Sequence, residues 1–153
     1  MTAASPGSAA RCDLCTLLAA PGAALVWGDQ QLSVVAVDEP EYPGFTRVVW
    51  NAHVKEMTDL LPAERTRVMD VVWAVEAAQR AVLAPEKINL ASFGNMTPHV
   101  HWHVIPRYTD DAHFPNPTWA VAQRASAPEV LAARRALLPA LHAAIVERLK
   151  DPS

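Results

Sequence analysis

The sequence is short of basic residues, of long apolar runs and of cysteine, and each shortage excludes a class of protein. Lysine and arginine number 13 against 16 acidic residues and form no cluster, so the chain lacks the positive patch that nucleic acids require. No apolar run reaches membrane-spanning length, and the small, polar residues 1–10 lack the apolar stretch of a signal peptide. We therefore expect a soluble, cytoplasmic protein with neither nucleic acid nor a membrane as its partner.

The only two cysteines are Cys12 and Cys15. In a reducing compartment such a pair more often holds a metal ion or carries out redox chemistry than forms a structural disulfide. The strand and helix context of a thioredoxin-like redox motif is missing around it. Two thiolates at this spacing suit a tetrahedral ion, but two ligands do not close a site.

Hydrophobic residues are abundant, at 51% of 153 residues, which is enough for one compact domain with a core. We expect a single domain over residues 11–150, preceded by a disordered tail over residues 1–10. β-Branched runs predict strands over residues 32–37 and 47–50, which the turn between them would join as an antiparallel pair. Apolar residues at helical spacing predict a helix over residues 62–84.

The second half of the chain is predicted to contain two strands followed by helix. Residues 88–93 and 99–105 are the predicted strands, the second of them stopped by Pro106. Apolar residues near the end predict a helical segment over about residues 127–150, which Pro139 would kink or divide. Short strands with helices between and after them favour an α+β fold over a parallel βαβ fold.

Three of the six histidines alternate along the stretch "HVHWHVIPR". Side chains of a strand point alternately to its two faces, so His99, His101 and His103 would share one face while the residues between them pack on the other. Such a row suits two chemistries: a metal site with imidazole ligands, or a phosphate site in which an imidazole is the nucleophile. The spacing does not separate them.

The loop before this row favours the phosphate site. Gly94, Asn95 and Thr97 provide backbone N–H groups, an amide and a hydroxyl, which are the groups that bind phosphate. The same residue types also form turns, and for Gly94 and Thr97 that interpretation is equally good.

The stretch "HVHWHVIPR" resembles the histidine-triad (HIT) motif, His-φ-His-φ-His-φ-φ, of a family of nucleotide hydrolases and transferases. Other features follow in the family's order over about residues 11–110: the cysteine pair, an acid after a strand, a histidine in "RVVWNAH", the middle helix and the glycine-led loop. "NMTPHVHWHVIPR" and "DDAHFPNPTW" are similar to a bacterial branch of the family. The resemblance implies a HIT-like antiparallel sheet with a long middle helix and a C-terminal helical segment, usually in a homodimer.

The resemblance also implies a mechanism. His101 would attack the α-phosphate of a nucleotide and form a nucleotidyl-histidine that water cleaves, with no cofactor in the chemical step. A neutral imidazole is available as a nucleophile at physiological pH, which agrees with this role. His103 would donate to a phosphate oxygen or to the leaving group.

Four further residues match positions at which the family binds its substrate. Asp38 resembles the acid that binds the ribose hydroxyls, although an acid before Pro40 is also a common turn residue. Asn89 would face the same pocket, and Asn95 and Thr97 match phosphate contacts. Asn95 stands where the family more often has glutamine, so this chain departs from the pattern there.

The family and its larger relative galactose-1-phosphate uridylyltransferase imply a metal site formed by Cys12, Cys15, His53 and His99. A closed site of this kind would hold a structural Zn²⁺ and tie the N-terminal segment to the sheet. The alternative is that the cysteines bind no metal and that His99 only flanks the phosphate site.

The leading hypothesis is a hydrolase acting on an adenosine-like nucleotide, with a dinucleoside polyphosphate or a nucleoside phosphoramidate as substrate. One alternative is a nucleotide-binding sensor or interaction protein without catalysis, and another is a metalloenzyme whose triad holds a catalytic ion. Arg107, His113 and His142 are expected at the surface, and the proline-rich residues 110–119 are expected to form a solvated loop. The alternative for Arg107 and this loop is a part in the choice of leaving group.

Overall fold

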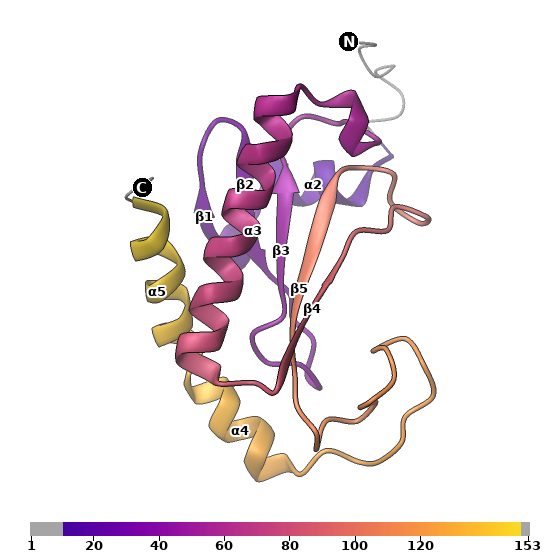
Figure 1. The fold of residues 1–153 in the computed structure, drawn as a ribbon, viewed down its shortest axis with the longest axis vertical. Coiled ribbons are helices and arrows are strands. Elements are labelled where there is room, and N and C mark those ends of the chain that lie inside the picture. The colour runs from indigo at the N-terminus through magenta and orange to yellow at the C-terminus, as the bar shows by residue number, and fades with distance from the viewer. Residues whose placement is uncertain (1–10, 151–153) are drawn as a thin grey trace.

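The computed structural model describes residues 11–150, and the predicted N-terminal tail lies outside this range. The centre is a five-stranded sheet in the order β1-β2-β3-β5-β4, and every neighbouring pair is antiparallel (Figure 1). The strands are β1 (Leu25–Gly28), β2 (Leu32–Ala36), β3 (Thr46–Trp50), β4 (Lys87–Ala91) and β5 (His101–Arg107). The prediction of an α+β fold with an antiparallel sheet is confirmed.

Helix α3 (Pro62–Leu83) covers one face of the sheet (Figure 1). Pro62 occupies the first helical position, where its missing N–H costs no hydrogen bond, and the Glu64 carboxylate accepts from the backbone N–H of Leu61 at 2.7 Å. The buried valines that pack between helix and sheet are Val68, Val71, Val72 and Val75 of α3 and Val34, Val48 and Val104 of the strands. The predicted helix over residues 62–84 is confirmed to within one residue.

Helix α5 (Leu138–Lys150) packs beside α3 on the same side of the sheet (Figure 1). Its Leu141 and Ile145 are fully buried in the core. Helix α4 (Pro128–Ala136) precedes it, and the helical structure is interrupted between the two helices at Leu137. The predicted helical segment is therefore divided close to the proline that was expected to divide it. None of the helices within residues 11–150 is long and apolar enough to cross a membrane.

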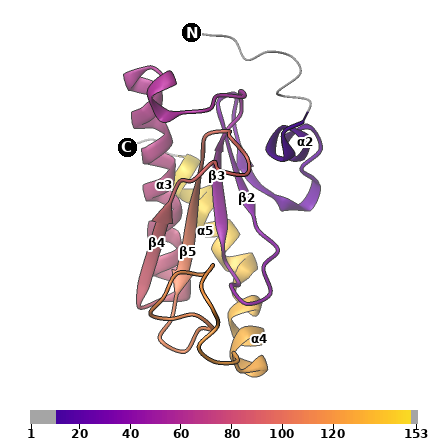
Figure 2. The same cartoon turned by 90° about the vertical axis from the view of Figure 1, so that its right-hand side faces the viewer.

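The short helix α2 (Asp13–Ala19) packs on the opposite face of the sheet (Figure 2). Its buried Leu14 contacts Val35 and Val49 of the two central strands β2 and β3. Neither this helix nor β1 was predicted from the sequence. Two single 3₁₀ turns complete the described elements, at Gly22–Ala24 and Met57–Asp59.

The predicted strand over residues 99–105 is wrong at both ends, because β5 begins at His101 and continues through Pro106. Before the strand, the backbone N–H of His99 bonds to the carbonyl of Thr97 at 2.8 Å, which turns the chain away from a ladder. Pro106 has no backbone N–H to donate. It is tolerated because the pairing of β3 with β5 stops at Val104, so no residue of β3 lies opposite Pro106 to accept a hydrogen bond. The preceding strand β4 likewise ends at residue 91, two residues before the predicted end.

Candidate active site and metal centre

Strand β5 places His101 and His103 on the face of the sheet opposite α3, with their ring centres 5.0 Å apart. Their cross-strand neighbours on β3 are Val49 and Arg47, respectively. Residues directly opposite each other in an antiparallel pair project to the same face, so these four side chains belong to one surface. The alternation predicted from the sequence is correct for these two histidines.

His101 is held in one tautomer. Its Nδ1 lies 2.6 Å from the backbone carbonyl oxygen of His99, and because a carbonyl only accepts, Nδ1 carries the proton. Nε2 therefore keeps its lone pair. Burial, together with the charge of Arg47, lowers the pKa of His101 despite this hydrogen bond. The ring is thus neutral at physiological pH and has a nitrogen that can act as a nucleophile.

His103 is half-buried beside His101, and its Nε2 is buried without a hydrogen-bond partner among residues 11–150. The rings of Phe45 and Phe93 lie edge-on to it, with centroid distances of 5.3 and 5.8 Å. Burial, with the charges of Arg47 and His101, lowers the pKa of His103 to about 4. Buried polar atoms are rarely left without a partner in folded proteins, so this nitrogen is available to a bound molecule.

His99 faces a different part of the molecule from the other two histidines. It is 1% exposed, and its Nε2 donates to the carbonyl oxygen of Trp50, which leaves the lone pair on Nδ1. That Nδ1 lies 3.5 Å from the Sγ atoms of both Cys12 and Cys15, and the Nδ1 of His53 lies 3.3 Å from the Sγ of Cys15. The four predicted ligands are therefore brought together, with all four donor atoms within 4.8 Å of one another.

These four donors fit a tetrahedral metal ion. Bonds of about 2.3 Å to sulfur and about 2.0 Å to nitrogen at tetrahedral angles place nitrogen and sulfur about 3.5 Å apart, and the observed distances are 3.3 to 3.5 Å. The Trp50 carbonyl orients His99 as outer partners of metal ligands do. Burial and the neighbouring Cys12 raise the pKa of the Cys15 thiol to about 11. A bound cation favours the thiolate and so opposes this shift.

The predicted substrate-binding residues are in contrasting environments. Asp38 and Asn95 are exposed and Thr97 is half-buried, and none of these three side chains makes a hydrogen bond within the described residues. Asn89 is different, because its Oδ1 accepts from the Nη1 of Arg107 at 2.7 Å. Asn89 and Arg107 also line a cavity of about 460 Å³, and Asp38 is not among the residues of its wall.

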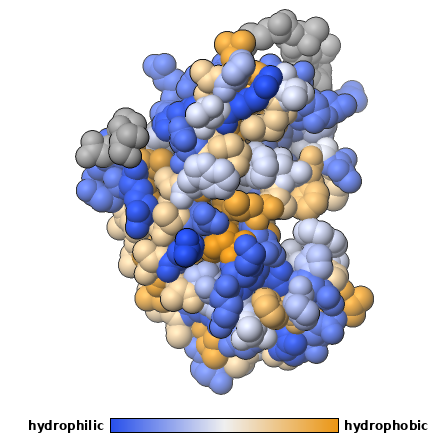
Figure 3. Space-filling view, viewed as in Figure 1, coloured by the Kyte–Doolittle hydropathy of each residue, from blue (hydrophilic) through white to orange (hydrophobic). Residues whose placement is uncertain are grey.

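The cavity lies between the edge strand β4 and residues 115–119 of the loop that follows β5. Figure 3 shows the surface hollowed on this side of the molecule, between the loop before β5 and the loop after it. Ala91 lines the cavity and is the cross-strand neighbour of His103, so the cavity reaches the edge of the histidine surface. Trp119 lines it from the loop and packs edge-on against Phe93, with ring centroids 5.0 Å apart.

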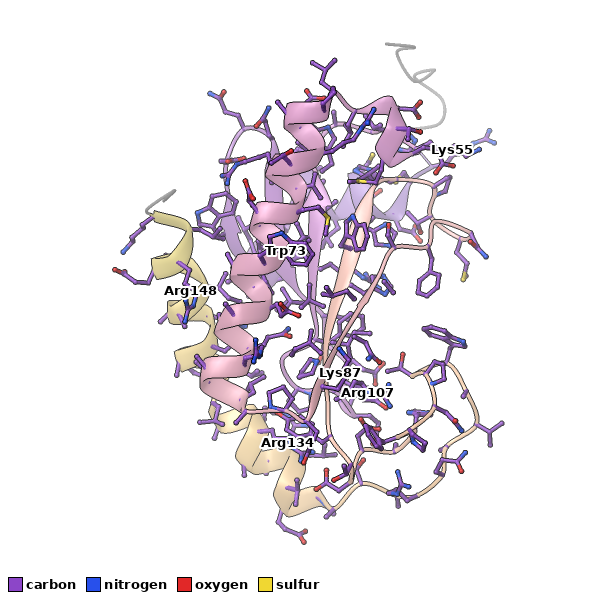
Figure 4. All side chains as sticks on the ribbon, in the orientation of Figure 1. Lys55, Trp73, Lys87, Arg107, Arg134 and Arg148 are labelled. Carbon is purple, nitrogen blue, oxygen red and sulfur yellow. The ribbon has the colours of Figure 1, made fainter. Side chains whose placement is uncertain are left out.

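Arg107 was predicted at the surface, and this prediction is wrong: the residue is 2% exposed (labelled in Figure 4). Its Nε and Nη2 donate to the two carboxylate oxygens of Asp111 at 2.7 and 3.1 Å, and Nη2 also donates to the carbonyl of Asn116 at 2.7 Å. Burial alone would raise the pKa of Asp111, but the bonds from Arg107 and from backbone N–H groups lower it to about 2. This buried ion pair fastens the loop to β5.

The prediction of a solvated loop over residues 110–119 is correct only in part, because Asp110, Asn116 and Trp119 are exposed whereas other residues are buried. Asp111 and Ala112 are buried. His113, also predicted at the surface, is half-buried, and its Nδ1 lies 2.6 Å from the hydroxyl of Tyr42. His142 is half-buried in α5 and is likewise less exposed than predicted.

Arg47 is the residue of the histidine surface that the sequence did not reveal. Its place depends on the register between β3 and β5, which pairs it with His103. The only local signal is a charged residue inside the otherwise apolar and β-branched strand segment "TRVVW". A charge at such a position faces either solvent or a site.

The comparisons with known proteins agree with one another. The family model described as HIT domain matches residues 22–110. A histidine triad protein from Bradyrhizobium japonicum has a TM-score of 0.65 at 23% identity, over 81% of this chain and 88% of its own. A zinc-bound histidine triad family protein from Mycobacterium smegmatis has a TM-score of 0.59 at 21% identity, over 89% and 99% of the two chains. A search of curated proteins found no match.

Proposed function

The chain belongs to the HIT domain family, whose members are generally nucleotide-binding hydrolases or nucleotidyltransferases, and from this premise we propose that it hydrolyses an adenosine-type nucleotide at the α-phosphate. The substrate class is a dinucleoside polyphosphate or a nucleoside phosphoramidate. His101 is the nucleophile and His103 its partner on the same surface.

The observation that carries this proposal is the tautomer of His101. The bond from Nδ1 to the His99 carbonyl leaves the lone pair on Nε2, and the lowered pKa keeps the ring neutral. In the first step Nε2 forms a bond to the α-phosphorus, and the bond from phosphorus to the leaving group breaks, with its electron pair going to the leaving atom. In the second step water attacks the phosphorus, the bond to Nε2 breaks, and one proton of the water passes to the neutral His103 and on to solvent.

We assign substrate binding to four residues because they match positions at which the family binds its substrate: Asp38, Asn89, Asn95 and Thr97. The exposed Asp38 carboxylate has no partner within the described residues and is free to accept from the two ribose hydroxyls. Asn95 and Thr97 precede β5 on the loop next to His99 and would contact phosphate oxygens. Asn89 has its Oδ1 engaged by Arg107, which leaves its amide N–H groups as donors.

The ion held by Cys12, Cys15, His53 and His99 is proposed to be Zn²⁺. Zinc prefers a tetrahedral set of thiolates and imidazoles, and a closed set of four protein ligands has a structural role. This role fits a cluster that joins the first turn of α2, through Cys12 and Cys15, to His99, two residues before β5. We also propose a cytoplasmic location, because in a reducing compartment a cysteine pair of this spacing more often holds a metal ion than forms a disulfide.

A homodimer is proposed as the working form. The strand β4 lies at the edge of the sheet with one side unpaired in the described chain, and edge strands are commonly covered. Trp73, on the outward side of α3, is 48% exposed (Figure 4). Sedimentation at two protein concentrations tests the assembly, and a monomer at both would contradict it.

The test of the activity is AMP release from adenosine 5′-phosphoramidate and from diadenosine tetraphosphate. Wild type should release AMP from at least one of them, and His101→Ala should lower the rate by about 10³-fold or more, because the covalent step is lost. His142→Ala is the control, since His142 is half-buried where His101 is buried, and it lies in α5 and not on the histidine surface. Nucleotide binding without release from either compound would contradict hydrolysis of these substrates and favour a sensor.

A further inference from the structure

The guanidinium of Arg47 lies on the same surface as the two histidines that carry the proposed chemistry. Arg47 is directly opposite His103 in the register of β3 and β5, and its other cross-strand neighbour is Val35 on β2. Directly opposite residues have Cβ atoms about 4.5 to 5.5 Å apart. The guanidinium carbon of Arg47 and the ring centre of His103 lie 5.8 and 5.3 Å from the centroid of the same Phe45 ring, so the guanidinium lies near His103.

This cation lacks a counter-ion. The Nε of Arg47 is buried without a hydrogen-bond partner, and its side chain takes part in none of the ion pairs or hydrogen bonds within residues 11–150. Its one aromatic contact is the ring of Phe45, 5.8 Å from the guanidinium carbon. Burial lowers the pKa of Arg47, but an arginine remains charged at physiological pH.

Arg107 shows what the same fold does with an arginine that only stabilises the structure. Arg107 has a carboxylate, an amide oxygen and a carbonyl around its guanidinium, whereas Arg47 has none of these. A partly buried charge without a partner costs free energy. Such a cost is retained at sites where a ligand supplies the missing partner, and the ligand of a guanidinium is an anion, above all a phosphate.

We propose that Arg47 binds the phosphate that follows the one attacked by His101, so that the protein is selective for substrates whose leaving group is a polyphosphate. The proposal rests on the proposed function and narrows it to dinucleoside polyphosphates over nucleoside phosphoramidates. Both classes share the α-phosphate and the nucleoside, and they differ only in the leaving group.

The chemistry explains why an arginine would make this distinction. When His101 Nε2 bonds to the α-phosphorus of diadenosine tetraphosphate, the bond to the bridging oxygen breaks and ATP departs with the electron pair. Negative charge therefore grows on the β-phosphate, next to the guanidinium, and a fixed cation stabilises that charge. A phosphoramidate releases ammonia after protonation of the nitrogen, and an uncharged amine gains nothing from Arg47.

The experiment compares kcat/KM for diadenosine tetraphosphate and adenosine 5′-phosphoramidate in wild type, Arg47→Met and Arg47→Lys. The ratio of the two kcat/KM values should fall about 10- to 100-fold in Arg47→Met, which is the effect of losing a charge-assisted hydrogen bond, and Arg47→Lys should recover part of it. Arg67→Met is the matched control, because Arg67 forms an ion pair with Asp29 away from the histidines. An unchanged ratio in Arg47→Met would overturn the proposal.

Two measurements that need no turnover accompany it. Inorganic tripolyphosphate should bind to wild type and bind at least 10-fold more weakly to Arg47→Met. The melting temperature of Arg47→Met should stay level or rise, because an unpaired charge is removed, and a fall like that of a core substitution would assign Arg47 a structural role and overturn the proposal. If wild type releases no AMP from either nucleotide, the proposed function fails, whereas binding of tripolyphosphate still decides whether Arg47 holds phosphate.

Discussion

His99 and His103 belong to the same short stretch of chain, yet their surroundings are opposite in kind. Both ring nitrogens of His99 have partners, the Trp50 carbonyl on one side and the cysteine sulfurs on the other. His103 has a buried nitrogen without a partner, and the Nε of Arg47 beside it also lacks one. Four buried side-chain polar atoms in residues 11–150 have no partner, and two of them thus belong to residues that lie directly opposite each other on β3 and β5.

The difference teaches which part of the row stabilises the fold and which part is kept for a ligand. We call Cys12, Cys15, His53 and His99 the closed end, and His101, His103 and Arg47 the open end. Unpaired buried polar groups lower stability, so changes at the open end should affect binding and catalysis more than folding. Changes at the closed end should do the reverse.

The largest effect is expected from breaking the closed end with Cys15→Ser. Removing one of the four candidate ligands should release the proposed Zn²⁺, and the free energy of unfolding should fall by about 5 kcal/mol or more. Metal analysis of the purified protein and urea unfolding measure the two quantities. His101→Ala should keep the ion, and loss of metal from that variant instead would indicate a catalytic metal in the triad.

A second large effect is expected outside both ends, at the buried ion pair of Arg107 and Asp111, from Asp111→Asn. This change leaves the guanidinium of Arg107 buried without its counter-charge, which should lower the free energy of unfolding by about 3 to 5 kcal/mol. Asp110→Asn is the matched control, because Asp110 is more than half exposed in its ion pair with Arg134 and should cost at most about 1 kcal/mol. Equal losses in the two variants would show that burial of Arg107 does not matter.

A smaller effect is expected at Asp38→Asn. The side chain is exposed and makes no hydrogen bond within the described residues, so the melting temperature should not change. If the carboxylate accepts from the ribose hydroxyls, kcat/KM for an adenosine nucleotide should fall by about 10-fold. For the 2′,3′-dideoxy substrate, kcat/KM should be the same in Asp38→Asn as in wild type. A lower kcat/KM in the variant would show that Asp38 does not act through the ribose hydroxyls.

The smallest effect is a pH dependence that His103 contributes. Its pKa in the folded protein is lowered to about 4, below the usual value of about 6.5 in the unfolded chain. The unfolded state therefore takes up the proton first, and stability is lost as the pH falls from about 6.5 towards 4. Melting temperatures across this range should fall less steeply for His103→Gln than for wild type, and parallel curves would contradict the shifted pKa.

The sequence was informative where periodicity and residue type both pointed to one structure. Valines at helical spacing predicted α3, and alternation predicted that His101 and His103 share a face. The beginning of β5 was missed because a turn at Thr97 to His99, a matter of backbone hydrogen bonds, interrupts the alternating pattern. Helix α2 and strand β1 were missed because they are short and contain little periodic signal.

The site residues that were missed are charged residues whose partners are set by tertiary structure. Arg107 was expected at the surface because arginine is seldom buried, and only the fold brings Asn89 and Asn116 to it. Arg47 could not be placed because its neighbour His103 is on another strand. The four candidate metal ligands were grouped by a family resemblance, since no spacing rule connects His53 with the cysteine pair, and the structure brings their donor atoms together.

The continuity of β5 restricts how the gene for this protein can vary. A codon inserted or deleted between His101 and His103 would exchange the two faces for every later residue of the strand. His103 would then turn towards α3, and Arg107 would point away from Asp111. Substitutions can therefore accumulate along the strand one at a time, whereas the number of residues in the strand must stay the same.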